Sequence, residues 1–260
     1  MKMIFIPLAL SILVPALAAA NTTGTPDPSA IAAAAERAIE VASMWSDAGA
    51  LKAATRTLDD ALTRAPDDAA LLYTRGFAYY AESLSLYRDP KNRVAMKRCL
   101  DKGVDELERV KGAPWETEAV ALEANLLGSL IGFQDDPAMA GATFGMKSSR
   151  LLGQAAAAAP GNPRVLLFRG TSLLFTPPEY GGDPGLGVAT IEKAVDHFAS
   201  DGATAAGPHW GHAQALAWLG LARQRTGDLA GARAAWEKAL ALEPNYAWVK
   251  FALLPSLGHK

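Results

Sequence analysis

Cysteine is almost absent from this chain of 260 residues, which contains only Cys99. No internal disulfide can form, so packing must stabilise the fold. The formal net charge is -2 and the pI is near 6.1, and lysine and arginine form no cluster along the sequence. Nucleic acids and anionic membranes usually require a basic face. We therefore expect neither of them as a partner.

Catalytic motifs are also missing. The sequence has no nucleophile elbow and no phosphate-binding glycine loop. Cys99 has no histidine nearby in the sequence, so we expect a buried, inert thiol. Glu116, Glu118 and Glu123 are expected to lie on a solvated helix face rather than to form an acid–base pair. These absences predict a protein that is not an enzyme and has no cofactor.

Histidine is scarce, and only one pair is closely spaced. His209 and His212 flank Trp210 and Gly211, so both imidazoles would share a helical face if a helix had already begun there. No cysteine or glutamate nearby completes a recognisable ligand set. We therefore predict no metal site.

The N-terminus does carry an apolar run. Met1 and Lys2 precede apolar residues 3–20, which end in alanines and are followed by polar residues. This pattern predicts a secretory signal peptide over residues 1–20, and hence export to the periplasm with no membrane insertion after cleavage. An uncleaved membrane anchor is the alternative. Residues 21–30 are rich in Thr, Pro and Ser, which favours a flexible lead-in.

An internal repeat organises the rest of the chain. Its clearest copy lies near the C-terminus and contains Gly220, Gly227, Ala232, Trp236 and Pro244. The small residues at 220 and 232 would let two antiparallel helices approach closely, while Trp236 fills the gap between them. Gly227 would turn the chain, and Pro244 would end the second helix. The spacing therefore predicts a helix pair.

The same pattern recurs upstream. Pro66 precedes Gly76 by the same interval that separates Pro160 from Gly170, so these two connections should share one geometry. Asp68 can cap the helix that follows Pro66. Past the last repeat, residues 246–254 predict a short capping helix that ends at Pro255. Further repeat positions are Trp45, Gly49, Ala54, Leu58, Ala61, Leu127, Gly128, Leu152 and Ala155.

Three segments between paired helices are longer than the repeat requires. They cover residues 83–93, 132–145 and 175–181. Since such insertions tend to project from one side of a helical stack, we expect them to form a rim.

These repeat positions resemble those of tetratricopeptide-repeat proteins over nearly all of the mature chain, although Arg223 stands where an aromatic residue is usual. The resemblance is narrower to exported bacterial members, because the Pro-x-x-Tyr-Gly-Gly-Asp loop at 177–183 is similar to that of small periplasmic proteins of unassigned function. It is weaker to a helical subunit associated with some periplasmic transporters. The resemblance implies an all-α fold of antiparallel helix pairs, stacked in a right-handed solenoid over residues 31–260, and it implies binding rather than catalysis.

In tetratricopeptide-repeat proteins the first helix of each pair lines the concave surface. Carrying these positions over implies a groove that is aromatic at one end and amide-rich and basic at the other. Such a groove suits an extended peptide with an acidic end, or a small amphipathic ligand. The implied binding residues are Tyr73, Phe77, Tyr80, Asn125, Ser129, Arg164, Thr171, Gln214, Gln224 and Arg225.

Tyr180 is a further candidate binding residue, because its Tyr-Gly-Gly-Asp loop could present backbone N–H groups to a ligand. The loop has an equally good structural interpretation, in which Gly182 turns the chain and Asp183 caps the next helix.

Two functions follow from these residues. The first is a periplasmic binding or adaptor protein that holds a peptide segment or a partner protein on its concave surface. The alternative is a small-molecule binder of a transport system, with a pocket for a small apolar ligand built from Tyr73, Phe77, Tyr80 and the Tyr180 loop. An open groove with exposed Arg164 and Arg225 would favour the first function, and a closed aromatic cavity the second.

Overall fold

The computed structural model describes residues 27–87, 89–201 and 207–258, and these residues form helices and connections without any strand. The predicted signal peptide and most of the predicted lead-in lie outside them. The helical elements are α1 (Pro28–Trp45), α2 (Ala48–Leu62), α3 (Ala69–Leu86), η1 (Pro90–Asn92), α4 (Arg93–Glu108), α5 (Glu116–Leu130), η2 (Ile131–Phe133), α6 (Pro137–Ala140), η3 (Gly141–Gly145), α7 (Met146–Ala158), α8 (Pro163–Phe175), η4 (Pro178–Tyr180), α9 (Pro184–Asp201), α10 (His212–Arg225), α11 (Leu229–Leu242), η5 (Val249–Leu253) and α12 (Leu254–Ser256).

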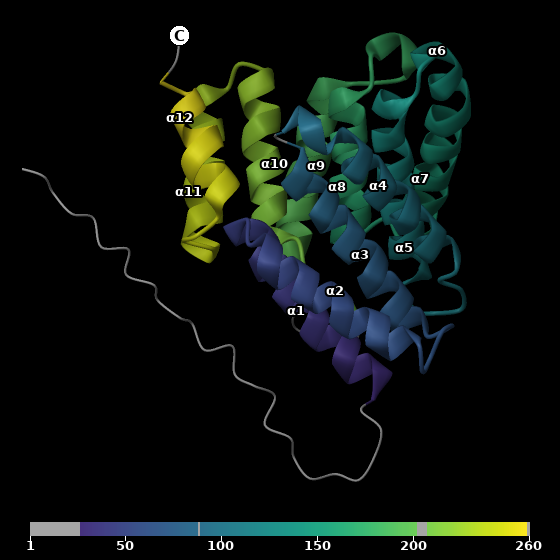
Figure 1. The fold of residues 1–260 in the computed structure, drawn as a ribbon. Helices are drawn as coiled ribbons and strands as arrows, with labels where there is room; N and C mark the ends of the chain where they lie inside the picture. Colours follow the sequence, from purple (N-terminus) through teal and green to yellow (C-terminus); the bar gives the residue numbers. More distant parts are fainter. Residues whose placement is uncertain (1–26, 88, 202–206, 259–260) are drawn as a thin grey trace, which may run out of the picture.

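The long helices pack as pairs, and each pair packs on the next. The pairs in the described residues are α1 with α2, α3 with α4, α5 with α7, α8 with α9, and α10 with α11. Contacts of α2 with α3, α4 with α5, α7 with α8 and α9 with α10 join successive pairs. Figure 1 shows the resulting stack, which runs from α4–α7 on the right to α10–α12 on the left. The predicted all-α architecture of stacked helix pairs is confirmed.

The two connections with equal proline-to-glycine spacing do share a geometry. Asp68 caps α3 by accepting a hydrogen bond from the backbone N–H of Leu71, at 3.0 Å. Asn162 caps α8 in the same way, accepting from the N–H of Val165 at 3.1 Å, and it also accepts from the N–H of Arg164 at 3.0 Å. Each cap satisfies backbone donors that the first turn of a helix leaves free.

Close helix packing in the last pair depends on Gly220. A Cβ at this position would clash with the indole of Trp236, which is fully buried and donates from Nε1 to the carbonyl of Ala217 at 3.0 Å. The predicted roles of these two residues are therefore confirmed.

Much of the three inserted segments is helical rather than loop. Residues 83–86 extend α3, η1 directly precedes α4, and α6 and η3 lead without a break into α7. The segment after α8 keeps an irregular course around η4. Two boundaries also differ from those predicted: α1 begins at Pro28, capped by Asp27, and the C-terminal helix continues past Pro255 to Ser256.

The first helix closes the stack on itself. The carboxylate of Glu36 accepts from the N–H of His209 at 2.9 Å, and that of Glu40 accepts from the N–H of Gly211 at 2.9 Å. Trp45 at the end of α1 donates to Glu243 at 3.0 Å. Figure 1 accordingly shows α1 and α2 crossing the lower side of the stack toward α10 and α11. No described helix is long and apolar enough to span a membrane.

Candidate functional site: the inner face of the helix stack

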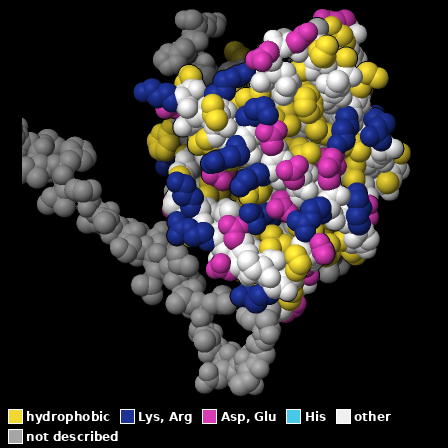
Figure 2. All heavy atoms as spheres, turned by 45° about the vertical axis from the view of Figure 1, so that its right-hand side comes forward, with side chains coloured by type: hydrophobic (Ala, Val, Ile, Leu, Met, Phe, Trp, Pro, Cys, Tyr) yellow, Lys and Arg dark blue, Asp and Glu magenta, His cyan; other side chains and the backbone are white. Residues whose placement is uncertain are grey.

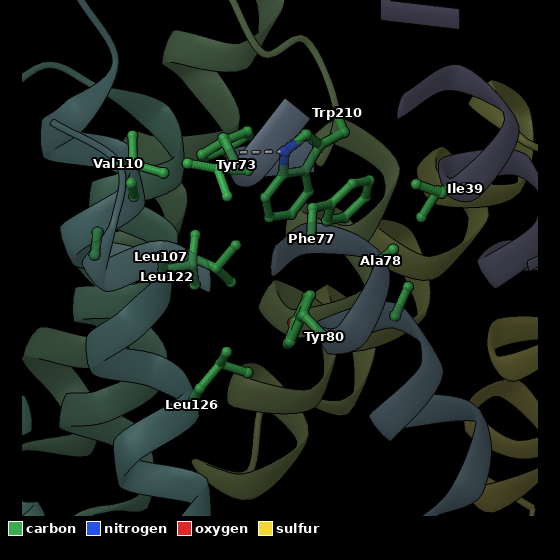
Figure 3. Close-up of a cluster of buried hydrophobic side chains, with 14 of the residues drawn as sticks. Ile39, Tyr73, Phe77, Ala78, Tyr80, Leu107, Val110, Leu122, Leu126 and Trp210 are labelled. Atoms are coloured by element: carbon green, nitrogen blue, oxygen red, sulfur yellow. Dashed lines mark hydrogen bonds between the residues drawn. The ribbon is translucent and has the colours of Figure 1, made fainter. Parts of the chain in front are cut away.

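Trp210 occupies the centre of the inner face, where an open solenoid would leave a groove. Its indole is 1% exposed and stacks on Phe77, with 4.1 Å between the ring centroids and 16° between the planes. Its Nε1 donates to the hydroxyl of Tyr73 at 3.0 Å (Figure 3). Tyr80 and Phe168 flank the ring. The side chain of Trp210, which belongs to the segment directly before α10, therefore fills this space. We call this side chain the plug.

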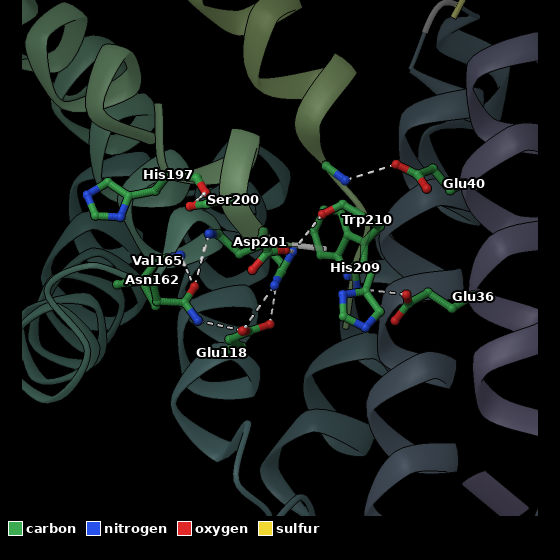
Figure 4. A network of polar contacts seen from close by, with 12 residues as sticks. Glu36, Glu40, Glu118, Asn162, Val165, His197, Ser200, Asp201, His209 and Trp210 are labelled. Atoms are coloured by element: carbon green, nitrogen blue, oxygen red, sulfur yellow. Dashed lines mark hydrogen bonds and ion pairs between the residues drawn. The ribbon is translucent and has the colours of Figure 1, made fainter. Parts of the chain in front are cut away.

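Arg164 lies beside this plug in a network of buried charges. Its Nε donates to Glu118 at 2.6 Å, while one terminal nitrogen donates to Asp201 at 2.7 Å and to the carbonyl of Trp210 at 2.9 Å (Figure 4). The side chain of Arg164 is only 2% exposed. A charge buried this deeply must be paired to be tolerated, and these partners satisfy that requirement.

The two carboxylates of α1 line the other side of the plug. Burial raises the pKa of Glu36 to about 7, although the hydrogen bond from the backbone of His209 and the charge of Arg164 oppose that rise. Burial also raises the pKa of Glu40, against the hydrogen bond from Gly211. Their contacts with the segment 209–211 fix the position of Trp210 (Figure 4).

Two acidic residues expected on a solvated face are in fact buried. Glu118 is 6% and Glu123 is 4% exposed, and they pair with Arg164 and Lys147. The expectation was wrong because their partners come from helices later in the chain. Cys99 is buried as expected, and burial raises the pKa of its thiol to about 12.

The predicted groove residues divide into two groups. Gln224 and Asn125 are half-buried, and Ser129, Tyr180 and Arg225 are exposed. Arg164 is buried, so the condition that would favour the first function, an open groove with Arg164 and Arg225 exposed, is met only for Arg225. The binding roles of all these residues stay predictions. The buried group, which the structure packs into the interior, comprises Tyr73, Phe77, Tyr80, Arg164, Thr171 and Gln214.

The Tyr180 loop is a turn and a helix cap. Gly181 has a left-handed φ of 92°, and the side chain of Asp183 accepts from the N–H of Leu186 at 2.9 Å in the first turn of α9. Tyr180 itself is 78% exposed, whereas Tyr73 is buried against Trp210. These residues therefore do not enclose a common pocket in the described structure.

His209 and His212 do not share a helical face, because α10 begins only at His212. His212 begins α10 and stacks on Phe198 at 5.8 Å, and burial lowers its pKa although Asp201 opposes this shift. His209 precedes the helix, and its N–H is bound to Glu36. No cluster of His, Cys, Asp and Glu suited to a metal ion occurs in the part of the chain that the structure describes.

One part of the inner face stays accessible. Phe175 at the end of α8 packs edge-to-face on Trp218 of α10, with ring centroids 5.7 Å apart, and Trp218 packs on Trp248 at 5.1 Å. The guanidinium of Arg225 lies 4.9 Å from the centre of the Phe175 ring. Phe175 is 47% exposed, Trp218 and Trp248 are half-buried, and Arg225 is exposed. We call these four residues the aromatic patch.

The aromatic patch connects to the plugged interior through Tyr80. The hydroxyl of Tyr80 accepts from Gln214 at 2.8 Å, and Gln214 and Trp218 both lie on α10. The sequence analysis included Arg225 among the implied binding residues but did not include Trp218 or Trp248. Trp218 precedes the repeat glycine Gly220 by two residues on the same helix, and that spacing is the signal that could have found it.

No protein-family model matches the sequence, and no curated protein matches it. Among solved structures, the HusA haemophore from Porphyromonas gingivalis is similar to this chain, with 24% sequence identity and a TM-score of 0.52 over 78% of this chain and 97% of that chain. MamA from Desulfovibrio magneticus RS-1 aligns with 16% identity and a TM-score of 0.37 over 86% of this chain and 99% of that chain. The likeness to HusA is one of fold: the stacked helices described above correspond to nearly the whole of that structure, and the all-helical architecture is consistent with a tetratricopeptide-like fold.

Proposed function

We propose that this protein is an exported binding protein, without catalytic activity, that holds a peptide segment of a partner at the aromatic patch. The observation that carries the proposal is a contiguous aromatic surface beside exposed Arg225, formed by exposed Phe175 and the half-buried rings of Trp218 and Trp248. Tryptophan and arginine are the residues that most often dominate the binding energy of protein interfaces.

The chemistry of the patch defines the peptide. Half-buried indole rings offer a large apolar surface whose conformational freedom is already restricted, so little entropy is lost when a side chain packs on them. Arg225 already lies over Phe175, where it can donate to a carboxylate without leaving the ring. We therefore expect a peptide with an aromatic or large aliphatic side chain close to an acidic group.

A flat apolar ligand is the second candidate. The fold likeness to a haemophore covers 97% of that chain, and edge-to-face indole rings next to an arginine also suit a porphyrin that carries carboxylates. This candidate corresponds to the small-ligand function that the sequence left open.

A binding experiment with two variants tests both candidates. Peptides that bind the protein are selected from a random display library. Binding of haemin is followed separately, by the change in the protein's tryptophan fluorescence as haemin is added. Trp218→Ala combined with Arg225→Ala should weaken the selected peptides at least about tenfold, since each removed contact is worth on the order of 1–3 kcal/mol. Tyr87→Ala combined with Arg37→Ala removes an exposed aromatic residue and a cation elsewhere, and should leave binding unchanged.

The outcomes are distinct. Peptides that lose affinity only in the patch variant support the first candidate, and haemin binding that is lost only in that variant supports the second. If neither ligand distinguishes the patch variant from its control, the aromatic patch is not the binding site.

Export rests on residues 1–20, whose sequence pattern is that of a signal peptide. N-terminal sequencing of the protein from a periplasmic extract checks this part of the proposal. A mature chain that starts near residue 21 is expected, and an intact N-terminus in the cytoplasmic fraction would contradict it.

A further inference from the structure

A second candidate site lies away from the aromatic patch, between α2, α3 and α4. It is a pocket of about 260 Å³ at the side of the stack, and its charge is unbalanced. Five cationic side chains line it, against the two carboxylates of Asp59 and Glu82. The cationic residues are Lys52, Arg56, Arg75, Arg98 and Lys102.

Only one of the five cations has an acidic partner. Arg75 forms an ion pair with Asp59 and also donates to the hydroxyl of Tyr79 at 2.7 Å. For the other four, no carboxylate oxygen of the described residues lies within 4.0 Å of the side-chain nitrogens. Figure 2 shows a face of the molecule on which lysines and arginines lie among aspartates and glutamates.

Tyr79 forms the aromatic wall of the pocket. Its ring is buried, and two cations lie over it, with Arg75 at 5.1 Å and Lys102 at 5.6 Å from the ring centre. Cation–π contacts hold both side chains near the pocket, although they do not neutralise the charge. Burial and the nearby charge of Glu82 raise the pKa of the Cys99 thiol, which also lines the pocket.

Gathering like charges in a concave site is unfavourable unless something compensates them. The cations repel one another, although solvent screens the exposed side chains of Lys52, Arg56, Arg98 and Lys102. A concave site with low-dielectric walls also concentrates the positive potential, which attracts anions. A protein whose formal net charge is -2 gains nothing for solubility from this cluster. The arrangement therefore points to a ligand that supplies negative charge.

We propose that this pocket binds a small organic polyanion that carries two or more carboxylate or phosphate groups. A volume of 260 Å³ admits a compact molecule and excludes a folded partner. Arg56 and Arg98, on the facing helices α2 and α4, supply planar donor groups that can hold two anionic oxygens each. This site is separate from the aromatic patch and does not depend on the function proposed for it.

Isothermal titration of the full chain with citrate and with inorganic pyrophosphate, at constant ionic strength, tests the proposal. We expect saturable binding of at least one probe and none of acetate, which carries a single charge. Arg56→Ala combined with Arg98→Ala should weaken binding by at least about tenfold, because both lost guanidinium groups would donate charge-assisted hydrogen bonds to the anion. Raising the salt concentration should weaken it further.

Arg233→Ala combined with Lys238→Ala is the matched control. It removes the same charge from exposed positions of α11, and its affinity should stay within about twofold of the unsubstituted protein. Far-UV circular dichroism of both variants establishes that the helices are intact. Binding of pyrophosphate alone identifies a phosphate ligand, and binding of citrate alone a polycarboxylate. If neither probe binds saturably, or if the pocket variant binds as well as its control, the proposal is wrong.

Discussion

Arg164 shows how much a single residue contributes to the inner face. It joins Glu118 of α5, Asp201 of α9 and the carbonyl of Trp210, so it ties two helix pairs to the plug. Replacing it with glutamate would place one more negative charge among the carboxylates of Glu118 and Asp201. A loss of binding in such a variant would report unfolding rather than contact with a ligand.

We predict that Arg164→Leu destabilises the protein by about 3–5 kcal/mol, because it leaves Glu118 buried without its cation. Urea unfolding followed by circular dichroism measures this change. Arg225→Leu is the control, since Arg225 is exposed, and we expect a change of less than about 1 kcal/mol. Equal stability of the two variants would show that the network does not hold the fold together.

The sequence could not reveal this network. Glutamates are usually solvated, and nothing local marks positions 118 and 123 as buried. Its partner Arg164 belongs to a later repeat, and the burial of both depends on Trp210, which arrives from a third. The burial of a charge that requires a partner from another repeat can be recognised only once the fold shows which residues meet.

At the scale of helices, the repeat pattern in the sequence predicted the structure far better than it predicted the buried charges. The roles of Gly220 and Trp236, and the equal caps of α3 and α8, were predictable because each depends on neighbours within one repeat or its junction. The inserted segments were less predictable, since their helical character at α6 and η3 depends on packing against α5 and α7.

The helix contact at Gly220 leads to a second prediction. Gly220→Ala should cost about 1–3 kcal/mol, because the added methyl group would clash with the buried indole of Trp236. Gly153→Ala in α7 is the matched control: nothing lies within 4 Å of the added Cβ, and helix propensity favours alanine by up to about 1 kcal/mol. The midpoint temperature of thermal unfolding should therefore fall for Gly220→Ala and rise for Gly153→Ala. A shift of the same sign in both variants would contradict the packing argument.

The contact of α1 with the plug predicts a dependence on pH. Burial raises the pKa of Glu36 from an ordinary value of 4.5 to about 7, so the folded state holds this proton more tightly than the unfolded state does. The resulting stabilisation is complete below pH 4.5 and is lost as the pH rises through 7. Its size is on the order of 3 kcal/mol. Glu40, whose pKa is also raised, adds to the same trend.

Glu36→Gln should remove most of this dependence, because the amide oxygen still accepts the hydrogen bond from His209 and carries no charge. Urea unfolding at pH 5 and at pH 8 provides the measurement. We expect the variant to be the more stable protein at pH 8, and the difference should shrink toward pH 5. Glu237→Gln, at an exposed position of α11, should keep the full pH dependence. An unchanged slope in Glu36→Gln would exclude Glu36 as its source.

At the scale of the whole molecule, closure distinguishes this stack from an open solenoid. In an open array each repeat contacts only its neighbours, and stability is close to a sum of local contributions. Here Tyr73 and Glu36, from the first two pairs, bond to residues directly before the last pair. We therefore expect unfolding to be one cooperative transition that coincides by tryptophan fluorescence and by far-UV circular dichroism.

Glu36→Ala combined with Glu40→Ala removes the acceptors that tie α1 to the segment 209–211. We expect this variant to lose cooperativity, so that the fluorescence transition precedes the circular dichroism transition. Thr57→Ala, which removes only a bond within α2, should leave the two transitions together. Separate transitions in the unsubstituted protein would show that closure does not couple the ends.

Closure also limits how the number of repeats can vary. Inserting a helix pair between α8 and α10 would displace Trp210 from Phe77 by about one interhelical distance, roughly 8–10 Å, and would break its stacking at 4.1 Å. Open solenoids gain and lose repeats by duplication because each junction is equivalent. In this chain the junctions are not equivalent, so we expect length changes during its evolution to be confined to the inserted segments and the two ends, with the count of central repeats preserved.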